Sequence, residues 1–148
     1  MNYERAALHE AGHAVTAVIL GLEFAQIRLS PPELVWGKEA FGKDVSHPTS
    51  EALALAVTTL AGAAALELIT GERHSCSDCS DLRQAREMLS QVRDAPSVEA
   101  TYAVAFSMLY RARVALTAVA IQLLVRGELP HSQVLTLVDC QLSSSAYG

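Results

Sequence analysis

Five residues near the start of the chain, His9-Glu10-Ala11-Gly12-His13, match the pattern His-Glu-x-x-His. If this segment is helical, the two histidines lie on one face, where their ring nitrogens can bind a single zinc ion at about 2.0–2.1 Å. The glutamate between them can then take a proton from a zinc-bound water. The motif therefore predicts two metal ligands, His9 and His13, and a general base, Glu10. The alternative that it leaves open is a helix with two core histidines and a chance glutamate.

The residues around the motif favour a helix from Tyr3 to Leu20. Asn2 is a suitable N-cap, and Glu4 lies in the first turn, where the helix dipole favours an acid. No proline interrupts the segment, its alanines favour a helix, and Gly21 is a typical stop. We therefore expect the motif to be helical, with small residues lining the side of the helix that carries the histidines.

The composition predicts one domain, residues 1–148, with a core of alanine, leucine and valine. Hydrophobic residues make up 51% of the chain and aromatic residues only 5%, which favours closely packed helices. A formal net charge of −5 offers no basic surface for nucleic acid. Two long apolar stretches, residues 52–69 and 102–125, carry polar or charged side chains that are costly in a bilayer. We expect them to be core helices rather than membrane spans.

The three cysteines and the N-terminal sequence indicate the cellular compartment of the protein. An odd cysteine count without a signal-peptide layout argues against a disulfide framework and predicts a cytoplasmic protein. Cys76 and Cys79 form a C-x-x-C motif, but a structural zinc site needs four ligands, and Cys140 could join them only if the C-terminus folds back. We interpret the pair as loop cysteines.

The pattern along the chain predicts an α+β fold that is mainly helical. After the first helix, residues 24–29 alternate between apolar and polar side chains like a half-buried strand. Residues 34–36 and 40–41 suggest one or two further short strands, which would complete a small sheet. A helical bundle follows, with helices expected at Glu51–Ile69, Asp81–Arg93, Ser97–Val125 and Ser132–Cys140.

One motif resembles a phosphate-binding loop but lacks two features that such a loop needs. Residues 37–43 fit the start of a phosphate-binding loop, G-x-x-x-x-G-K, yet Asp44 stands where that loop needs Ser or Thr to hold magnesium. A helix must also begin there, because the phosphate binds at a helix N-terminus, and Val45-Ser46-His47-Pro48 does not favour one. We therefore do not expect nucleotide binding.

A catalytic zinc ion usually has three protein ligands and one water. Spacing alone does not select the third ligand here. The candidates are Glu67, Asp78, Asp81, His47, His74, Cys76, Cys79 and His131.

Three segments resemble the peptidase domain of the FtsH family of ATP-dependent zinc proteases. Residues 7–15 are similar to its motif helix, and residues 60–68 with Gly71-Glu72 are similar to its Leu-Gly-Gly-Arg-Ala-Ala-Glu-Glu-Leu helix and the Gly-Glu after it. Ser80-Asp81-Leu82 with Ala85 resembles its Asn-Asp-Leu-x-x-Ala-Thr. The segments keep the family order over about residues 3–93. The resemblance implies that Asp81 is the third zinc ligand.

None of the departures from the family pattern falls on a proposed metal ligand. The loop before Asp81 is one residue longer, so Asp78 stays an alternative ligand. The family's arginine and the first of its paired glutamates are replaced by Ala63 and Leu66, and the ATPase half has no counterpart. Glu67 is expected either to hold the second ring N–H of a histidine or to be an ordinary surface acid near a helix end.

Two functions follow from these expectations. The first is a zinc-dependent metallopeptidase that hydrolyses flexible or unfolded polypeptides, with Glu10 as the base; a separate ATPase or adaptor is its candidate partner. The second is a non-catalytic peptidase-like module for binding or assembly that retains the metal site. Glu10 favours the enzyme, because a purely structural metal site does not need a base, whereas the missing motor favours the module.

Overall fold

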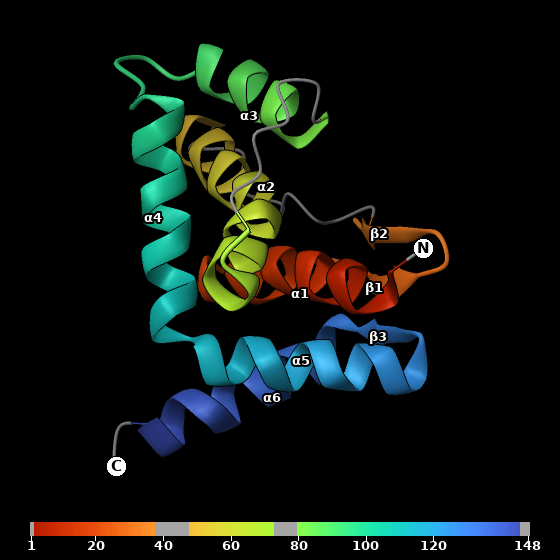
Figure 1. Ribbon diagram of the computed structural model, residues 1–148. Coiled ribbons are helices and arrows are strands. Elements are labelled where there is room, and N and C mark those ends of the chain that lie inside the picture. The colour runs from red at the N-terminus through yellow and green to blue at the C-terminus, as the bar shows by residue number, and fades with distance from the viewer. Residues whose placement is uncertain (1, 38–47, 73–79, 146–148) are drawn as a thin grey trace.

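The computed structural model describes residues 2–37, 48–72 and 80–145. These residues form six helices and a three-stranded antiparallel sheet, which confirms the mainly helical α+β fold (Figure 1). The elements are α1 (Tyr3–Ile19), β1 (Gln26–Leu29), β2 (Pro32–Val35), α2 (Pro48–Thr70), α3 (Ser80–Ser90), α4 (Val98–Arg111), α5 (Arg113–Arg126), β3 (Glu128–Pro130) and α6 (His131–Ser145).

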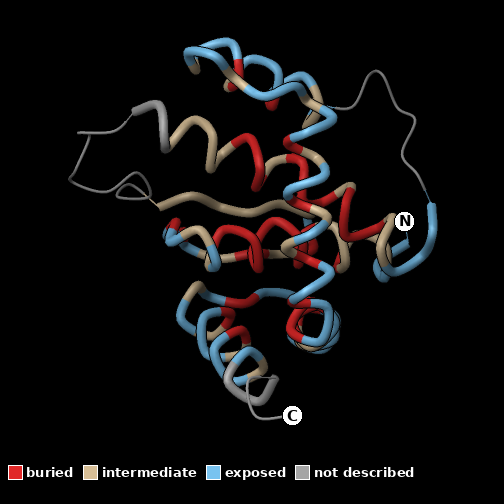
Figure 2. The backbone as a smooth tube through the Cα atoms, turned by 90° about the vertical axis from the view of Figure 1, so that its left-hand side faces the viewer, coloured by how far each residue is buried: buried red, intermediate tan, exposed pale blue. Residues whose placement is uncertain are grey.

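Helix α1 runs through the centre of the molecule and ends where the sequence predicts. The Asn2 side chain accepts a hydrogen bond from the backbone N–H of Arg5, and Gly21 after the helix has the left-handed φ of 77°. The middle of α1 is buried between α2 and α5 (Figures 1 and 2). A side chain at Gly12 would lie 2.6 Å from the Ala61 carbonyl oxygen, so the backbones of α1 and α2 pack in near contact.

The sheet has the order β2-β1-β3, with both pairings antiparallel. Ile27 pairs with Leu34 on one side and with Leu129 on the other, and Ile27 and Leu129 are fully buried. The third strand was not expected, since its three residues follow the glycine that ends α5. The possible strand at residues 40–41 lies outside the described residues.

Helix α2 is the longest helix and begins at Pro48, three residues before the predicted start. Proline suits the first turn of a helix, because its missing N–H would have no helical partner there. By length and composition, residues 51–70 would qualify as a membrane span, but 56% of the most apolar window is buried inside the fold. That burial is compatible with a core helix of a soluble protein.

The long helix expected at Ser97–Val125 is in fact two helices, and the prediction was wrong at this point. Helices α4 and α5 meet at Ala112 with a bend of 83°. Helix α4 packs against α2, whereas α5 packs against α1, so the bend allows one apolar segment to cover both core helices. The outer ends lie within one residue of the predicted bounds, with Ser97 as the N-cap of α4 and the left-handed Gly127 after α5.

Candidate metal centre

Helix α1 brings the three motif residues together. His9 and His13 are one turn apart, and their rings meet edge to face with centroids 4.6 Å apart. One potential ligand atom from each of His9, Glu10 and His13 lies within 4.8 Å of the other two. The helical spacing therefore produces the arrangement that the motif predicts.

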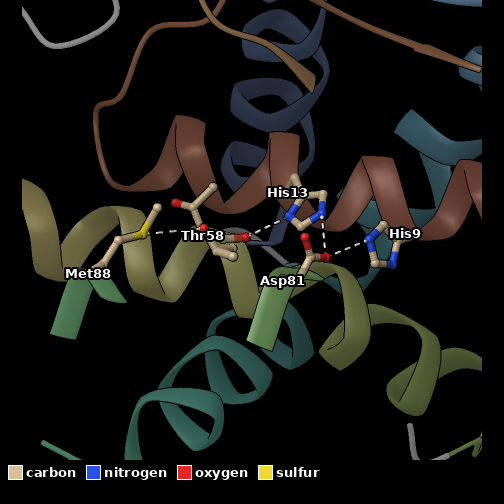
Figure 3. A network of polar contacts seen from close by, with 6 residues as sticks. His9, His13, Thr58, Asp81 and Met88 are labelled. Atoms are coloured by element: carbon tan, nitrogen blue, oxygen red, sulfur yellow. Dashed lines mark hydrogen bonds and ion pairs between the residues drawn. The ribbon is translucent and has the colours of Figure 1, made fainter. Parts of the chain in front are cut away.

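Asp81 reaches the same point from a distant part of the chain. It lies in the first turn of α3, and its Oδ2 atom is 2.9 Å from His9 Nε2 and 3.4 Å from His13 Nε2 (Figure 3). The Asp81 side chain is 20% exposed, so the carboxylate is mostly screened from water. The two histidines and Asp81 thus point three potential ligand atoms at one small volume.

A backbone carbonyl sets the orientation of His13. Its Nδ1 atom is 2.7 Å from the Thr58 carbonyl oxygen on α2 (Figure 3). A carbonyl can only accept, so Nδ1 carries the hydrogen and donates it. In the neutral ring, the lone pair is then on Nε2, which faces Asp81 and the centre of the site. A hydrogen bond of this kind is the usual support for a histidine that ligates a metal.

Gly62 leaves the space that the histidine rings occupy. A Cβ atom at this position of α2 would lie 2.7 Å from His9 Nε2 and 2.8 Å from His13 Nε2. Gly62 lies within residues 60–68, one of the three segments that resemble the family, but the sequence predicted no role for it or for the Thr58 carbonyl. The detectable signal for Gly62 was a glycine inside a long apolar helix, where it costs about 1 kcal/mol relative to alanine.

Glu10 is buried beside the histidines, with 5% of its surface exposed. Burial raises the pKa of its carboxyl, and the nearby His13 and His9 only partly oppose this effect. Its Oε2 atom has no hydrogen-bond partner among the described residues. A buried carboxylate oxygen without a partner is costly, so the arrangement suits a site in which a bound ion or water completes the contact.

The Asp81 and His13 side chains favour opposite charges. Burial acts to raise the pKa of Asp81, but hydrogen bonds with His13 and His9 outweigh it and hold that pKa well below its usual range. Burial acts to lower the pKa of His13, but the Asp81 hydrogen bond and the charges of Glu10 and Asp81 raise it overall. Asp81 is therefore a carboxylate at neutral pH, as a zinc ligand must be.

The site opens into a cavity of about 380 Å³. Strand β2 and Trp36 form one wall, the middle of α2 forms another, and the start of α3 forms a third. On the β2 wall, Glu33 forms an ion pair with Arg28 of the neighbouring strand. Strand β2 is an outer strand of the described sheet, and the cavity lies between this strand and the ligand cluster.

Glu67 was expected either to support a histidine or to be a surface acid, and in the structure its partner is a tyrosine. Its Oε2 atom accepts a hydrogen bond from the Tyr102 hydroxyl on α4. A hydrogen bond between Glu67 and a histidine is not among the contacts of the described residues, and the Thr58 carbonyl supports His13 instead. Glu67 therefore joins α2 to α4.

The remaining ligand candidates are elsewhere or outside the described residues. His131 begins α6 and packs against Phe24, whose backbone N–H lies 3.4 Å from His131 Nδ1. Cys140 is exposed on α6. The candidates outside the described residues are His47, His74, Cys76, Asp78 and Cys79.

Two imidazoles, one ionised carboxylate and the space left by Gly62 fit a zinc ion with three protein ligands. The ligand cluster faces a cavity, which would leave a further coordination position accessible. No protein-family model matches the chain, and no curated protein matches its sequence.

Proposed function

We propose that this protein is a zinc-dependent peptidase that resembles the peptidase domain of the FtsH family and holds its ion with His9, His13 and Asp81. The observation that carries the proposal is the position of Asp81 Oδ2, close to the Nε2 atoms of both motif histidines. A chance His-Glu-x-x-His helix has no reason to meet an acid that is 68 residues beyond its last histidine. When bound, zinc supplies a Lewis acid that polarises carbonyl and water oxygens.

Glu10 is the proposed general base. Its carboxylate takes a proton from the attacking water and can pass that proton to the leaving amide nitrogen, so that the charge is balanced when the peptide bond breaks. The raised pKa of Glu10 suits this transfer, because a carboxylate with a pKa above its usual value is a stronger base. Its neighbours on α1, the two histidines, keep it beside the reacting atoms.

The other residues of the site would hold the ion and orient its ligands. The Thr58 carbonyl keeps the hydrogen of His13 on Nδ1 and leaves Nε2 for the ion. Asp81 contributes the negative charge that two neutral imidazoles lack. Gly62 allows both rings to approach α2 without displacing it.

The cavity favours an extended, flexible polypeptide as the substrate. A volume of about 380 Å³ admits a few residues of a chain but not a folded domain. We infer that stable proteins reach the site only after they are unfolded, and that a separate ATPase or adaptor in the cytoplasm delivers them. The protein itself would cleave unfolded chains without that partner.

The test compares the wild type with Glu10→Gln, which keeps the shape of the side chain but removes its basicity. Both proteins should bind one zinc ion per chain, measured by elemental analysis. The wild type should cleave unfolded casein and quenched-fluorescence peptides, and the variant should be slower by about 10²–10⁴-fold. A wild type that binds zinc but cleaves no faster than Glu10→Gln would overturn the peptidase and leave the non-catalytic binding or assembly module.

A further inference from the structure

Helix α3, which carries Asp81, is held to the rest of the fold mainly through one neighbour, α2. Of its 11 residues, only Ala85 and Leu89 are buried. The helix lies at the periphery of the molecule and packs chiefly on α2 (Figure 1). Ala85 and Leu89 do not belong to the main apolar cluster formed by the other described helices and the sheet. A helix of this length is not stable alone in water, so α3 depends on its packing against α2.

Among the described residues, two polar contacts also hold α3. The Thr59 hydroxyl on α2 donates a long hydrogen bond, 3.7 Å, to the sulfur of Met88. At the other end of α3, Asp81 contacts His9 and His13 on α1. The second contact is the proposed ligand cluster itself, so an ion bound there would tie α3 to α1.

We propose that metal binding and the docking of α3 on α2 are one coupled equilibrium, in which Leu89 is a positioning residue for Asp81. The inference rests on the metal ligands of the proposed function but not on peptide hydrolysis. His9 and His13 belong to the central helix α1, which packs chiefly against α2 and α5 rather than against α3. Asp81 is in place only when α3 is docked, so an ion that needs all three ligands favours the docked state.

The coupling acts in both directions. An ion that binds only the docked state raises the equilibrium constant for docking by the factor 1 + [ion]/Kd. A change that loosens α3 lowers the docked fraction of the protein, and the apparent ion affinity falls in proportion to that fraction. Leu89 lies two turns from Asp81 and is not a ligand, so its effect on ion affinity can arise only through α3.

The same equilibrium shapes the substrate cavity. Ser80, Asp81 and Gln84 at the start of α3 form one wall of the cavity beside Glu10. Undocking of α3 would therefore remove a ligand and a wall together. The ion-bound state is the state with a complete site, so zinc supply would control the shape of the cavity as well as its chemistry.

Hydrogen exchange of the full chain, followed by mass spectrometry with and without zinc, tests the proposal. With zinc at about 100 times its Kd, amides of residues 80–90 should exchange up to about 100-fold more slowly. The centre of α1 should be protected under both conditions. Glu10→Gln should show the same zinc-dependent protection, because it keeps all three ligands.

Leu89→Ala supplies the reciprocal measurement. It should speed exchange in α3 without zinc and weaken zinc affinity, measured by competition with a chelating dye. Leu135→Ala, at a site on α6 that is 39% exposed, is the matched control and should change neither. Leu89→Val should show a smaller increase in α3 exchange and a smaller loss of zinc affinity. It replaces Leu89→Ala in the test if that variant does not fold.

Two results would overturn the proposal. One is equal exchange of α3 with and without saturating zinc, and the other is an undocked α3 in Leu89→Ala with unchanged zinc affinity. These outcomes are separate from the fate of the proposed function. Zinc-dependent protection without cleavage would refute the peptidase alone, whereas cleavage without zinc-dependent protection would refute the coupling alone.

Discussion

Gly62 on α2 lies so close to His13 on α1 that a methyl group at Gly62 would lie 2.8 Å from His13 Nε2. The same methyl group would lie 2.7 Å from His9 Nε2. Glycine in the interior of a helix costs about 1 kcal/mol relative to alanine, and α2 carries that cost at the point where both rings meet it. The contact indicates that α2 is shaped around the ligand cluster.

Gly62→Ala should therefore lose zinc while the fold persists. The atoms that must move are the ends of two histidine side chains rather than backbone, and alanine strengthens the helix. We expect zinc affinity to fall by about 10–100-fold, as when the support of a metal ligand is removed. Isothermal titration of the metal-free protein measures the affinity, and circular dichroism checks that helix content is retained.

Two other glycines serve as controls. Gly12→Ala would place a methyl group 2.6 Å from the Ala61 carbonyl oxygen, so it should separate α1 from α2 and lower the melting temperature. At Gly37, the nearest atom to an added methyl group is 4.0 Å away, so Gly37→Ala should leave zinc affinity unchanged. Wild-type zinc affinity in Gly62→Ala would refute the placement of the ion between the two histidines.

The motif helix could be predicted because its signals are local. Asn2, the run without proline and Gly21 define the ends of α1, and the four-residue spacing of the histidines defines its functional face. Asp81 could not be chosen from spacing, because eight candidates were compatible with it. Only the resemblance of three ordered segments selected it, and the contacts of Asp81 with His9 and His13 are those that this choice requires.

Long-range packing decided what the sequence could not predict. No proline or glycine marks the break between α4 and α5, and Ala112 favours a helix; the bend arises because α4 and α5 must cover different core helices. Strand β3 exists because Leu129 pairs with Ile27, about a hundred residues earlier. The role of Thr58 lies in its backbone carbonyl, which leaves no trace in the residue type.

Asp81→Ala should abolish tight zinc binding, whereas Asp78→Ala should not. Removal of the Asp81 carboxylate leaves two imidazoles, too few ligands for a stable catalytic site. The zinc content of each purified variant, measured after dialysis against a weak chelator, separates the two. Loss of zinc in Asp78→Ala with zinc retained in Asp81→Ala would move the third ligand to Asp78.

Tyr102→Phe should destabilise the protein without affecting zinc. The substitution removes the hydroxyl that donates to Glu67, and a hydrogen bond to a charged group contributes about 1.5–3 kcal/mol. Partial exposure of the pair places the expected loss near or below the lower end of that range. Urea unfolding measures the stability, and chelator competition measures the zinc affinity.

Glu67→Gln extends this test to the expectation that the sequence raised. If Glu67 only joins α2 to α4, the variant should lose part of the same stability and bind zinc like the wild type. A fall in zinc affinity in Glu67→Gln, with Tyr102→Phe unchanged, would instead give Glu67 the histidine-supporting role that was first expected for it.

Glu10→Gln should make the metal-free protein more stable at pH 7.5, although it removes the proposed base. Because burial raises the pKa of Glu10 above its unfolded value of about 4.3, the contribution of this group is most favourable below that pH. The contribution is lost as pH rises through the folded pKa, where the buried side chain must ionise with Oε2 unpaired. Glutamine stays neutral throughout, so its advantage should be small at pH 4 and grow toward pH 7.5.

The size of the effect follows from the cost of a buried polar group without a partner, about 1–3 kcal/mol. Each kcal/mol corresponds to about 2–4 °C in melting temperature for a chain of this size. Scanning calorimetry in a chelator at pH 4 and pH 7.5 measures the difference between variant and wild type. The difference should shrink when zinc is added, because a nearby cation stabilises the ionised carboxylate of the wild type. A difference that is independent of pH, or a wild type that is the more stable protein at pH 7.5 in chelator, would show that Glu10 is not held in an unfavourable ionised state for catalysis.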